Sequence, residues 1–62
     1  MTYKYRVIVI LQKNGENRYK YIDYFKYLKN AYRAFKMLEN FLTYLKKIEV
    51  IDNYELSLDI LK

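Results

Sequence analysis

The chain has 62 residues, of which 53% are hydrophobic and 19% aromatic, and its formal net charge is +5. It contains no Cys and no His, which excludes disulfides and thiolate metal sites and removes the commonest general base. A chain this short buries only about 60% of the surface that its unfolded form exposes. We therefore expect one compact domain over residues 1–62, with an aromatic core and a homodimer contact that adds stability.

Residues 3–13 alternate with the period of a β-strand. Val7 and Val9 fall on one face, while Ile8 and Ile10 fall on the other. The segment is rich in β-branched and aromatic residues, which strands favour. The first strand is therefore predicted to be apolar on both faces.

Asn14-Gly15 holds the only glycine and predicts a type I′ hairpin turn, which needs positive φ at both central positions. Residues 18–25 then return as a second strand. A two-residue turn would pair opposite charges with each other and aromatic residues with β-branched ones, and such pairs stabilise a sheet. The expected pairs are Lys13 with Glu16, Ile10 with Tyr19, Ile8 with Tyr21 and Arg6 with Asp23. A three-residue loop is the alternative, and it would reverse the facing of the second strand.

Residues 27–47 change to a helical period, with no Pro or Gly to interrupt it. The apolar seam consists of Leu28, Ala31, Phe35, Leu38, Leu42 and Leu45, widened on one flank by Ala34, Phe41 and Ile48. The opposite arc is polar and mostly basic. This segment is predicted to be an amphipathic helix.

Residues 54–60 alternate apolar and polar side chains, which predicts a third strand. Two alternatives remain: a capping box at Asp52–Glu55 that starts a short helix, or a second hairpin in which Asp52-Asn53 joins residues 48–51 to residues 54–61. We favour the single strand, because strict alternation over seven residues does not fit a helical face.

These elements predict an α+β fold of the form ββαβ, with a small three-stranded antiparallel sheet and one long helix on one face. A right-handed crossover through the helix places the third strand beside the first, in the order 2-1-3. The longest and most apolar strand then lies in the centre of the sheet.

Charge is unevenly placed along the chain. Up to Lys47, eleven basic residues accompany three acidic ones, a net charge of +8, and from Ile48 onward the net charge is −3. The acidic segment is formed by Glu49, Asp52, Glu55 and Asp59. It either pairs with the basic first strand inside the fold or faces a basic surface on another protein.

Two surfaces are candidate binding sites. One helix covers one face of the sheet, so Ile8, Ile10, Tyr19 and Tyr21 are expected on the other face, where a second copy or a protein partner would cover them. The second surface is the basic arc of the helix. Its cations could follow a phosphate backbone, with exposed tyrosines stacking on bases of a single strand. The basic helix face consists of Lys29, Arg33, Lys36 and Lys47.

Catalysis is not expected. Ser57 is the only serine and has no His partner, and a phosphate-binding loop needs more than one glycine. A Tyr or Lys base, or a carboxylate pair such as Asp23 with Glu55, would be the remaining catalytic groups. No metal and no cofactor is predicted. The longest apolar run, residues 7–11, is far below the roughly 20 residues of a membrane span, so we expect a cytoplasmic protein, in the host cytoplasm if it is viral.

No motif identifies a family. In size and composition the chain resembles the short, motif-free proteins of bacteriophages and mobile elements with A/T-rich genomes, anti-CRISPR proteins among them. The resemblance implies a non-enzymatic inhibitor that occludes a surface of a host protein, and it assigns no residue. The alternative from the residues themselves is a regulator that binds nucleic acid.

Overall fold

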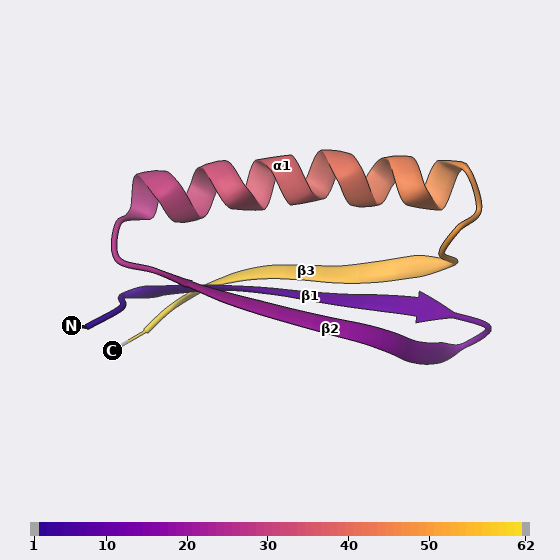
Figure 1. Ribbon diagram of the computed structural model, residues 1–62, viewed down its shortest axis with the longest axis horizontal. Coiled ribbons are helices and arrows are strands. Elements are labelled where there is room, and N and C mark those ends of the chain that lie inside the picture. The colour runs from indigo at the N-terminus through magenta and orange to yellow at the C-terminus, as the bar shows by residue number, and fades with distance from the viewer. Residues whose placement is uncertain (1, 62) are drawn as a thin grey trace.

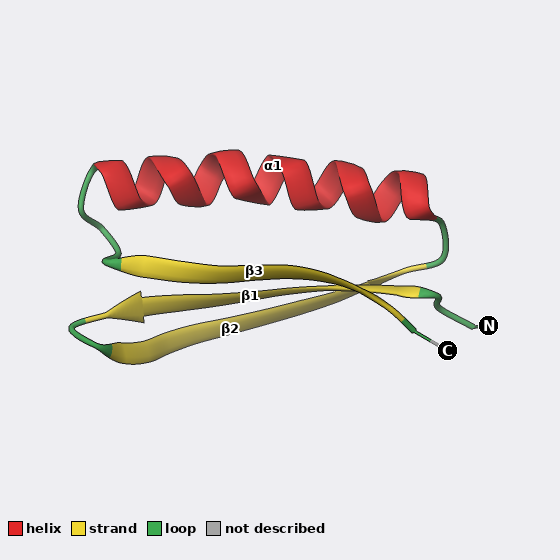
Figure 2. Ribbon diagram, turned by 180° about the vertical axis from the view of Figure 1, so that it is seen from behind, coloured by secondary structure: helices red, strands yellow, loops and turns green. Residues whose placement is uncertain are grey.

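The computed structural model describes residues 2–61 (Figures 1 and 2). The elements in chain order are β1 (Tyr5–Lys13), β2 (Glu16–Phe25), α1 (Leu28–Lys47) and β3 (Asn53–Ile60). Both β2 and β3 pair antiparallel with β1, which gives the strand order β2-β1-β3. The predicted ββαβ order and the central first strand are confirmed, and the last segment is a single strand.

The turn between β1 and β2 has the predicted conformation. Asn14 has φ 54° and Gly15 has φ 77°, the positive values that a type I′ turn needs. A Cβ atom on Gly15 would meet nothing within 4 Å. The backbone conformation, and not a lack of space, therefore favours glycine at this position.

The register of the hairpin differs from the prediction beyond the turn. Lys13 pairs with Glu16 as expected, but the register then shifts, so that Gln12 lies opposite Asn17 and Leu11 opposite Tyr19. The shift leaves Arg18 as the extra residue of a β-bulge.

A single extra residue moves every later side chain of a strand to the opposite face. The predicted pairs of Ile10 with Tyr19, Ile8 with Tyr21 and Arg6 with Asp23 are therefore wrong. The observed partners on β2 are Lys20 for Ile10, Ile22 for Ile8 and Tyr24 for Arg6. The reversal that a three-residue loop would have caused is produced by the bulge, with the two-residue turn intact.

The helix covers the face of the sheet that carries Val7 and Val9, both of which are buried. Val9 packs with Leu42 of α1 and with Ile51, which precedes β3. The partly buried side chains around them also come from β1, α1 and β3: Leu11, Leu38, Leu45, Tyr54 and Leu56. The core thus lies under α1 between β1 and β3, and in both views β2 diverges from α1 toward the hairpin turn (Figures 1 and 2).

The predicted seam of the helix is buried only in part. Ala31 and Leu42 are fully covered, whereas Leu28 in the first turn is exposed. Phe41 and Ile48, on the flank of the seam, are exposed as well. The apolar arc of α1 is therefore wider than the surface that the sheet covers.

The helix ends in a Schellman motif. The N–H of Val50 donates to the carbonyl of Leu45 at 3.0 Å, and the N–H of Glu49 donates to the carbonyl of Lys46 at 3.2 Å. Glu49 has φ 63° and occupies the left-handed position where glycine is usual. The chain then turns back so that Asp52 N–H donates to Gln12 carbonyl at 2.9 Å, which docks the connection onto β1.

Candidate functional site

The open sheet face is the side of the sheet opposite α1. Because directly paired residues point to the same face, the partners of Ile8 and Ile10 define it. Its side chains form four rows across β2, β1 and β3: Tyr24, Arg6 and Asp59; Ile22, Ile8 and Ser57; Lys20, Ile10 and Glu55; Asn17, Gln12 and Asn53. An apolar centre is thus bordered by polar and charged residues at the two edges.

This face differs from the predicted binding set. Ile8 and Ile10 do lie on it, but the bulge places Tyr19 and Tyr21 on the helix side, opposite Leu11 and Val9. The four residues are therefore not brought together. Ile22, which the expected register placed on the other face, is the residue that joins Ile8.

A second apolar surface lies where α1 and β2 diverge, and we call it the α1–β2 groove. It consists of two hollows of about 430 Å³ and 170 Å³ that share Tyr21, Leu38 and Phe41 in their walls. Met37 and Phe41, on the rim, are 66% and 56% exposed. The side chains that define the groove are Tyr19, Tyr21, Phe25, Met37, Leu38 and Phe41.

The groove could not be found from the sequence, because it depends on two tertiary features. The bulge turns the aromatic residues of β2 toward the helix, and the position of α1 over β1 and β3 leaves those residues only half covered. The one feature of the sequence that indicated an uncovered surface was the apolar arc of the helix. With Phe41 on its flank, this arc is wider than the sheet can cover.

Asp23 is the charged residue of the groove wall. The hydroxyl of Tyr21 donates to Asp23 Oδ2 at 3.0 Å, and Asp23 Oδ1 accepts from the backbone N–H of Tyr24 at 2.9 Å. The hydrogen bond to the Asp23 carboxylate raises the pKa of Tyr21 above its ordinary value of 10.0, because that bond favours the protonated hydroxyl. The carboxylate thus holds the Tyr21 hydroxyl in the β2 wall of the groove, between Tyr19 and Phe25.

The basic helix face points away from the sheet, and its four residues are exposed as predicted. Lys36 donates to Glu39 Oε1 at 2.9 Å, whereas Lys29, Arg33 and Lys47 have no salt bridge among residues 2–61. The hydrogen bond to Glu39 raises the pKa of Lys36. No Lys or Arg occurs between Lys36 and Lys46, a gap of about 15 Å along a helix. The cations therefore form two groups and not a continuous row.

The acidic segment is largely used within the fold. Asp59 pairs with Arg6 at 3.0 Å, and Asp52 lies 3.5 Å from Lys13 Nζ and accepts from the N–H of Asn14. The backbone carbonyl of Glu49 accepts from Lys13 Nζ at 3.1 Å. The carboxylates of Glu49, after the helix, and Glu55, on the open sheet face, are exposed and have no salt bridge within residues 2–61.

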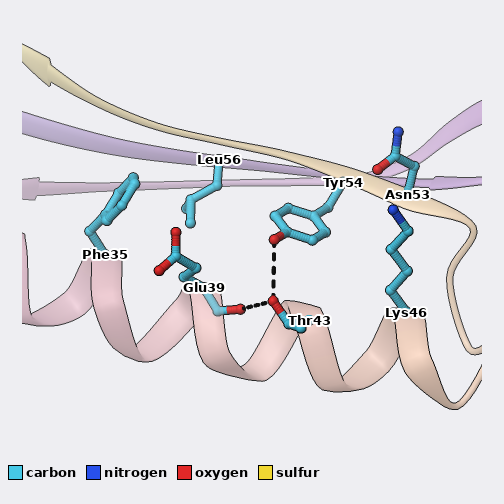
Figure 3. Close-up of a pocket in the computed structure, with 7 residues that line it drawn as sticks. All are labelled: Phe35, Glu39, Thr43, Lys46, Asn53, Tyr54 and Leu56. Atoms are coloured by element: carbon cyan, nitrogen blue, oxygen red, sulfur yellow. Dashed lines mark hydrogen bonds between the residues drawn. The ribbon is translucent and has the colours of Figure 1, made fainter.

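A polar hollow of about 460 Å³ lies on the other side of the helix, between α1 and β3 (Figure 3). Thr43 donates to the carbonyl of Glu39 at 2.8 Å, and its oxygen lies 3.3 Å from the Tyr54 hydroxyl. Phe35 and Leu56 close one end of the hollow, and the Lys46 side chain extends toward Asn53 at the other (Figure 3). These contacts join the helix to β3.

The structure does not bring together Asp23 and Glu55, the carboxylate pair considered as catalytic groups. Asp23 lies opposite Val7 on the helix side of the sheet, whereas Glu55 lies opposite Ile10 on the open face, so the two carboxylates are on different faces. Within residues 2–61 no three acidic residues lie close enough together to hold a metal ion. The single helix in the same part of the chain is not apolar enough to cross a membrane.

Fold and surfaces together define a small α+β domain with two uncovered apolar surfaces, the open sheet face and the α1–β2 groove. A comparison with protein families, with curated proteins and with solved structures found no match to this chain.

Proposed function

We propose that this chain is a non-enzymatic protein-binding domain, which inhibits or regulates a partner by occluding part of the partner's surface. The observation that supports the proposal is the α1–β2 groove. Large aromatic and aliphatic side chains from two elements converge there, and few polar groups lie among them. Such a surface matches apolar side chains of another protein, since aromatic residues and Met are enriched in interface cores.

The rim of the groove supports a protein partner in particular. Met37 and Phe41 stand on the exposed side of the wall, so a partner that inserts an apolar side chain between them and Tyr21 would remove all three from water. Tyr21 and Asp23 supply a hydroxyl and a carboxylate on the β2 wall, where the partner would offer hydrogen-bond donors. Aromatic anchors with a polar border are typical of binding hot spots.

The test is retention of partners from a host lysate by tagged chains that differ at one position. Phe41→Ser removes the groove wall, and Tyr44→Ser is its matched control, because both residues are 56% exposed on the same helix. Proteins identified by mass spectrometry should be retained by the wild type and by Tyr44→Ser, and lost with Phe41→Ser. Equal retention by all three chains would contradict a role for the groove.

A second candidate function is nucleic-acid binding by the basic helix face. The specific observation is that Lys29 and Arg33 are exposed beside Tyr32, which is also exposed, so phosphate contacts and a stacking surface occur together. Fluorescence anisotropy with a single-stranded oligonucleotide over a salt series tests it. Arg33→Ala should lower the log–log salt slope by roughly 0.7. The control Lys20→Ala, on the opposite side of the molecule, should leave the slope unchanged.

A further inference from the structure

The open sheet face carries opposite charges on its two edges. Lys20 of β2 and Glu55 of β3 both lie directly opposite Ile10 of the central strand. Two interstrand spacings, about 10 Å, separate their Cα atoms, with Ile10 between them, and the two side chains are not paired with each other. Neither has a salt bridge among residues 2–61. Each edge of this row therefore presents a charge that an external group can neutralise.

The two adjacent rows contain no further charge. One consists of Ile22, Ile8 and Ser57, and the other of Asn17, Gln12 and Asn53. In the remaining row Arg6 and Asp59 are already paired with each other at 3.0 Å. The charges free to contact a partner on this face are thus a cation on the β2 edge and an anion on the β3 edge, with isoleucines between them.

This arrangement is self-complementary under one kind of two-fold axis. An axis parallel to β1, lying between two sheets packed face to face, places β2 of one copy over β3 of the other without moving residues along the strand. Lys20 then faces the partner's Glu55, twice in each dimer, and the isoleucines of the two central strands meet. An axis perpendicular to the strands would instead place basic edge over basic edge.

We propose that the open sheet face binds a second copy of this chain through a two-fold axis parallel to β1, with Lys20 and Glu55 as the pairs that set the orientation. Two twisted sheets pack aligned at about 30° in this way. The dimer leaves both α1–β2 grooves on its outer sides. The proposal uses a different surface from the proposed function, so each can fail without the other.

The size of the face sets the expected affinity. Three strands about 4.8 Å apart and the 9 residues of β1 at about 3.4 Å each give a face of about 400 Å². A stable interface buries about 800 Å² per partner. We therefore expect a weak dimer, in exchange with the monomer at micromolar concentrations.

Sedimentation equilibrium from micromolar to millimolar concentration tests the proposal at low salt. The wild type should self-associate, and Lys20→Glu and Glu55→Lys should each raise the dissociation constant roughly tenfold, because both salt bridges are replaced by repulsion. The double variant should restore the wild-type constant, since it exchanges the two charges.

Net charge alone predicts a different result. Lys20→Glu lowers the charge of this basic chain and Glu55→Lys raises it, so a nonspecific effect would move the two single variants in opposite directions. A double variant that associates no better than the single variants would overturn the proposal. A wild type that stays monomeric over the whole range would also overturn it.

A second pair of variants locates the contact. Ile22→Asp introduces a charge on the open sheet face and should abolish the dimer. Because Ile22 is 40% exposed, we expect the monomer to tolerate the change. Phe41→Ser, on the groove, should leave the dimer intact. Circular dichroism confirms that both variants are folded. Association that survives Ile22→Asp would place the contact elsewhere and overturn the proposal.

Discussion

Arg6 and Asp59 are joined across 53 positions of the chain, because the guanidinium donates from Nε and Nη2 to the same carboxylate oxygen at 3.2 and 3.0 Å. The pair links the central strand to β3 at the end of the sheet. It also shows how the acidic last segment and the basic first segment neutralise each other within the fold. The charge asymmetry along the sequence is therefore partly cancelled in space.

Asp59→Asn should lower the free energy of unfolding by about 0.5–1 kcal/mol, since the pair is half-exposed but makes two charge-assisted hydrogen bonds. Urea denaturation at low and high salt measures the effect, which should shrink as salt screens the charges. The control Glu39→Gln breaks the exposed helical pair with Lys36 and should cost less than Asp59→Asn. Equal losses of stability in the two variants would contradict a larger contribution from the cross-strand pair than from the helical pair.

Arg18 is the extra residue of the bulge, and its deletion is predicted to leave the facing of β2 unchanged. Without Arg18, Asn17 stays opposite Gln12 and Tyr19 opposite Leu11, so the hairpin pairs regularly and Tyr19 and Tyr21 still face the helix. Deleting Lys20 should cost more stability, because either Tyr21, if the bulge is kept, or Tyr19, if it is lost, then points to the open sheet face. Thermal unfolding of the two deletion variants measures the difference, and a larger loss for the deletion of Arg18 would contradict this account of the bulge.

Leu42 and Phe41 are neighbours on α1 with opposite roles. Leu42 is 2% exposed and packs on Val9 and Ile51, so Leu42→Ala should cost about 2–5 kcal/mol. Phe41→Ala should cost less than about 1.5 kcal/mol, because more than half of its side chain is already in water. Chemical denaturation of both variants tests the difference. A larger loss for Phe41→Ala would mean that the groove wall is part of the core.

Glu49→Gly should stabilise the protein. Glu49 holds a left-handed conformation with φ 63° at the end of α1, which costs an ordinary residue about 1 kcal/mol and glycine almost nothing. Its N–H bond to Lys46 needs only the backbone. The melting temperature should therefore rise by a few degrees in a domain of this size. Glu49→Ala, which keeps the strain, is the control and should not raise the melting temperature.

The hydrogen bond from Tyr21 to Asp23 predicts a pH dependence. Because the folded pKa of Tyr21 lies above 10.0, its contribution to stability is fully present below the unfolded pKa and is lost as pH rises through the folded pKa. The difference in stability between wild type and Tyr21→Phe should be small at neutral pH, below about 0.5 kcal/mol for so exposed a group, and should vanish in strong alkali. Denaturation across the alkaline range measures it. A difference that grows with pH would contradict the sign.

The sequence by itself determined the kinds of elements, their order and the central place of the first strand. The kinds of elements and their order depend on local periodicity, two residues for the strands and three to four for α1, and on positive φ at Asn14-Gly15. The central place of β1 follows from the right-handed crossover through α1. The apolar seam of the helix and the third strand could be predicted from the sequence because both are periodic. The ion pairs of Arg6 and Lys13 followed from strand order, because that order brings the acidic segment beside β1.

Only the tertiary structure decided which side chains share a surface. The bulge adds one residue between two regular stretches and leaves no periodic trace, yet it reverses the facing of Tyr19 and Tyr21. The position of α1 over β1 and β3 depends on packing of Val9, Leu42 and Ile51 and opens the groove beside β2. Surfaces of this kind arise from the lateral fit of elements distant in the chain, and the alternation within a single strand carries no information about that fit.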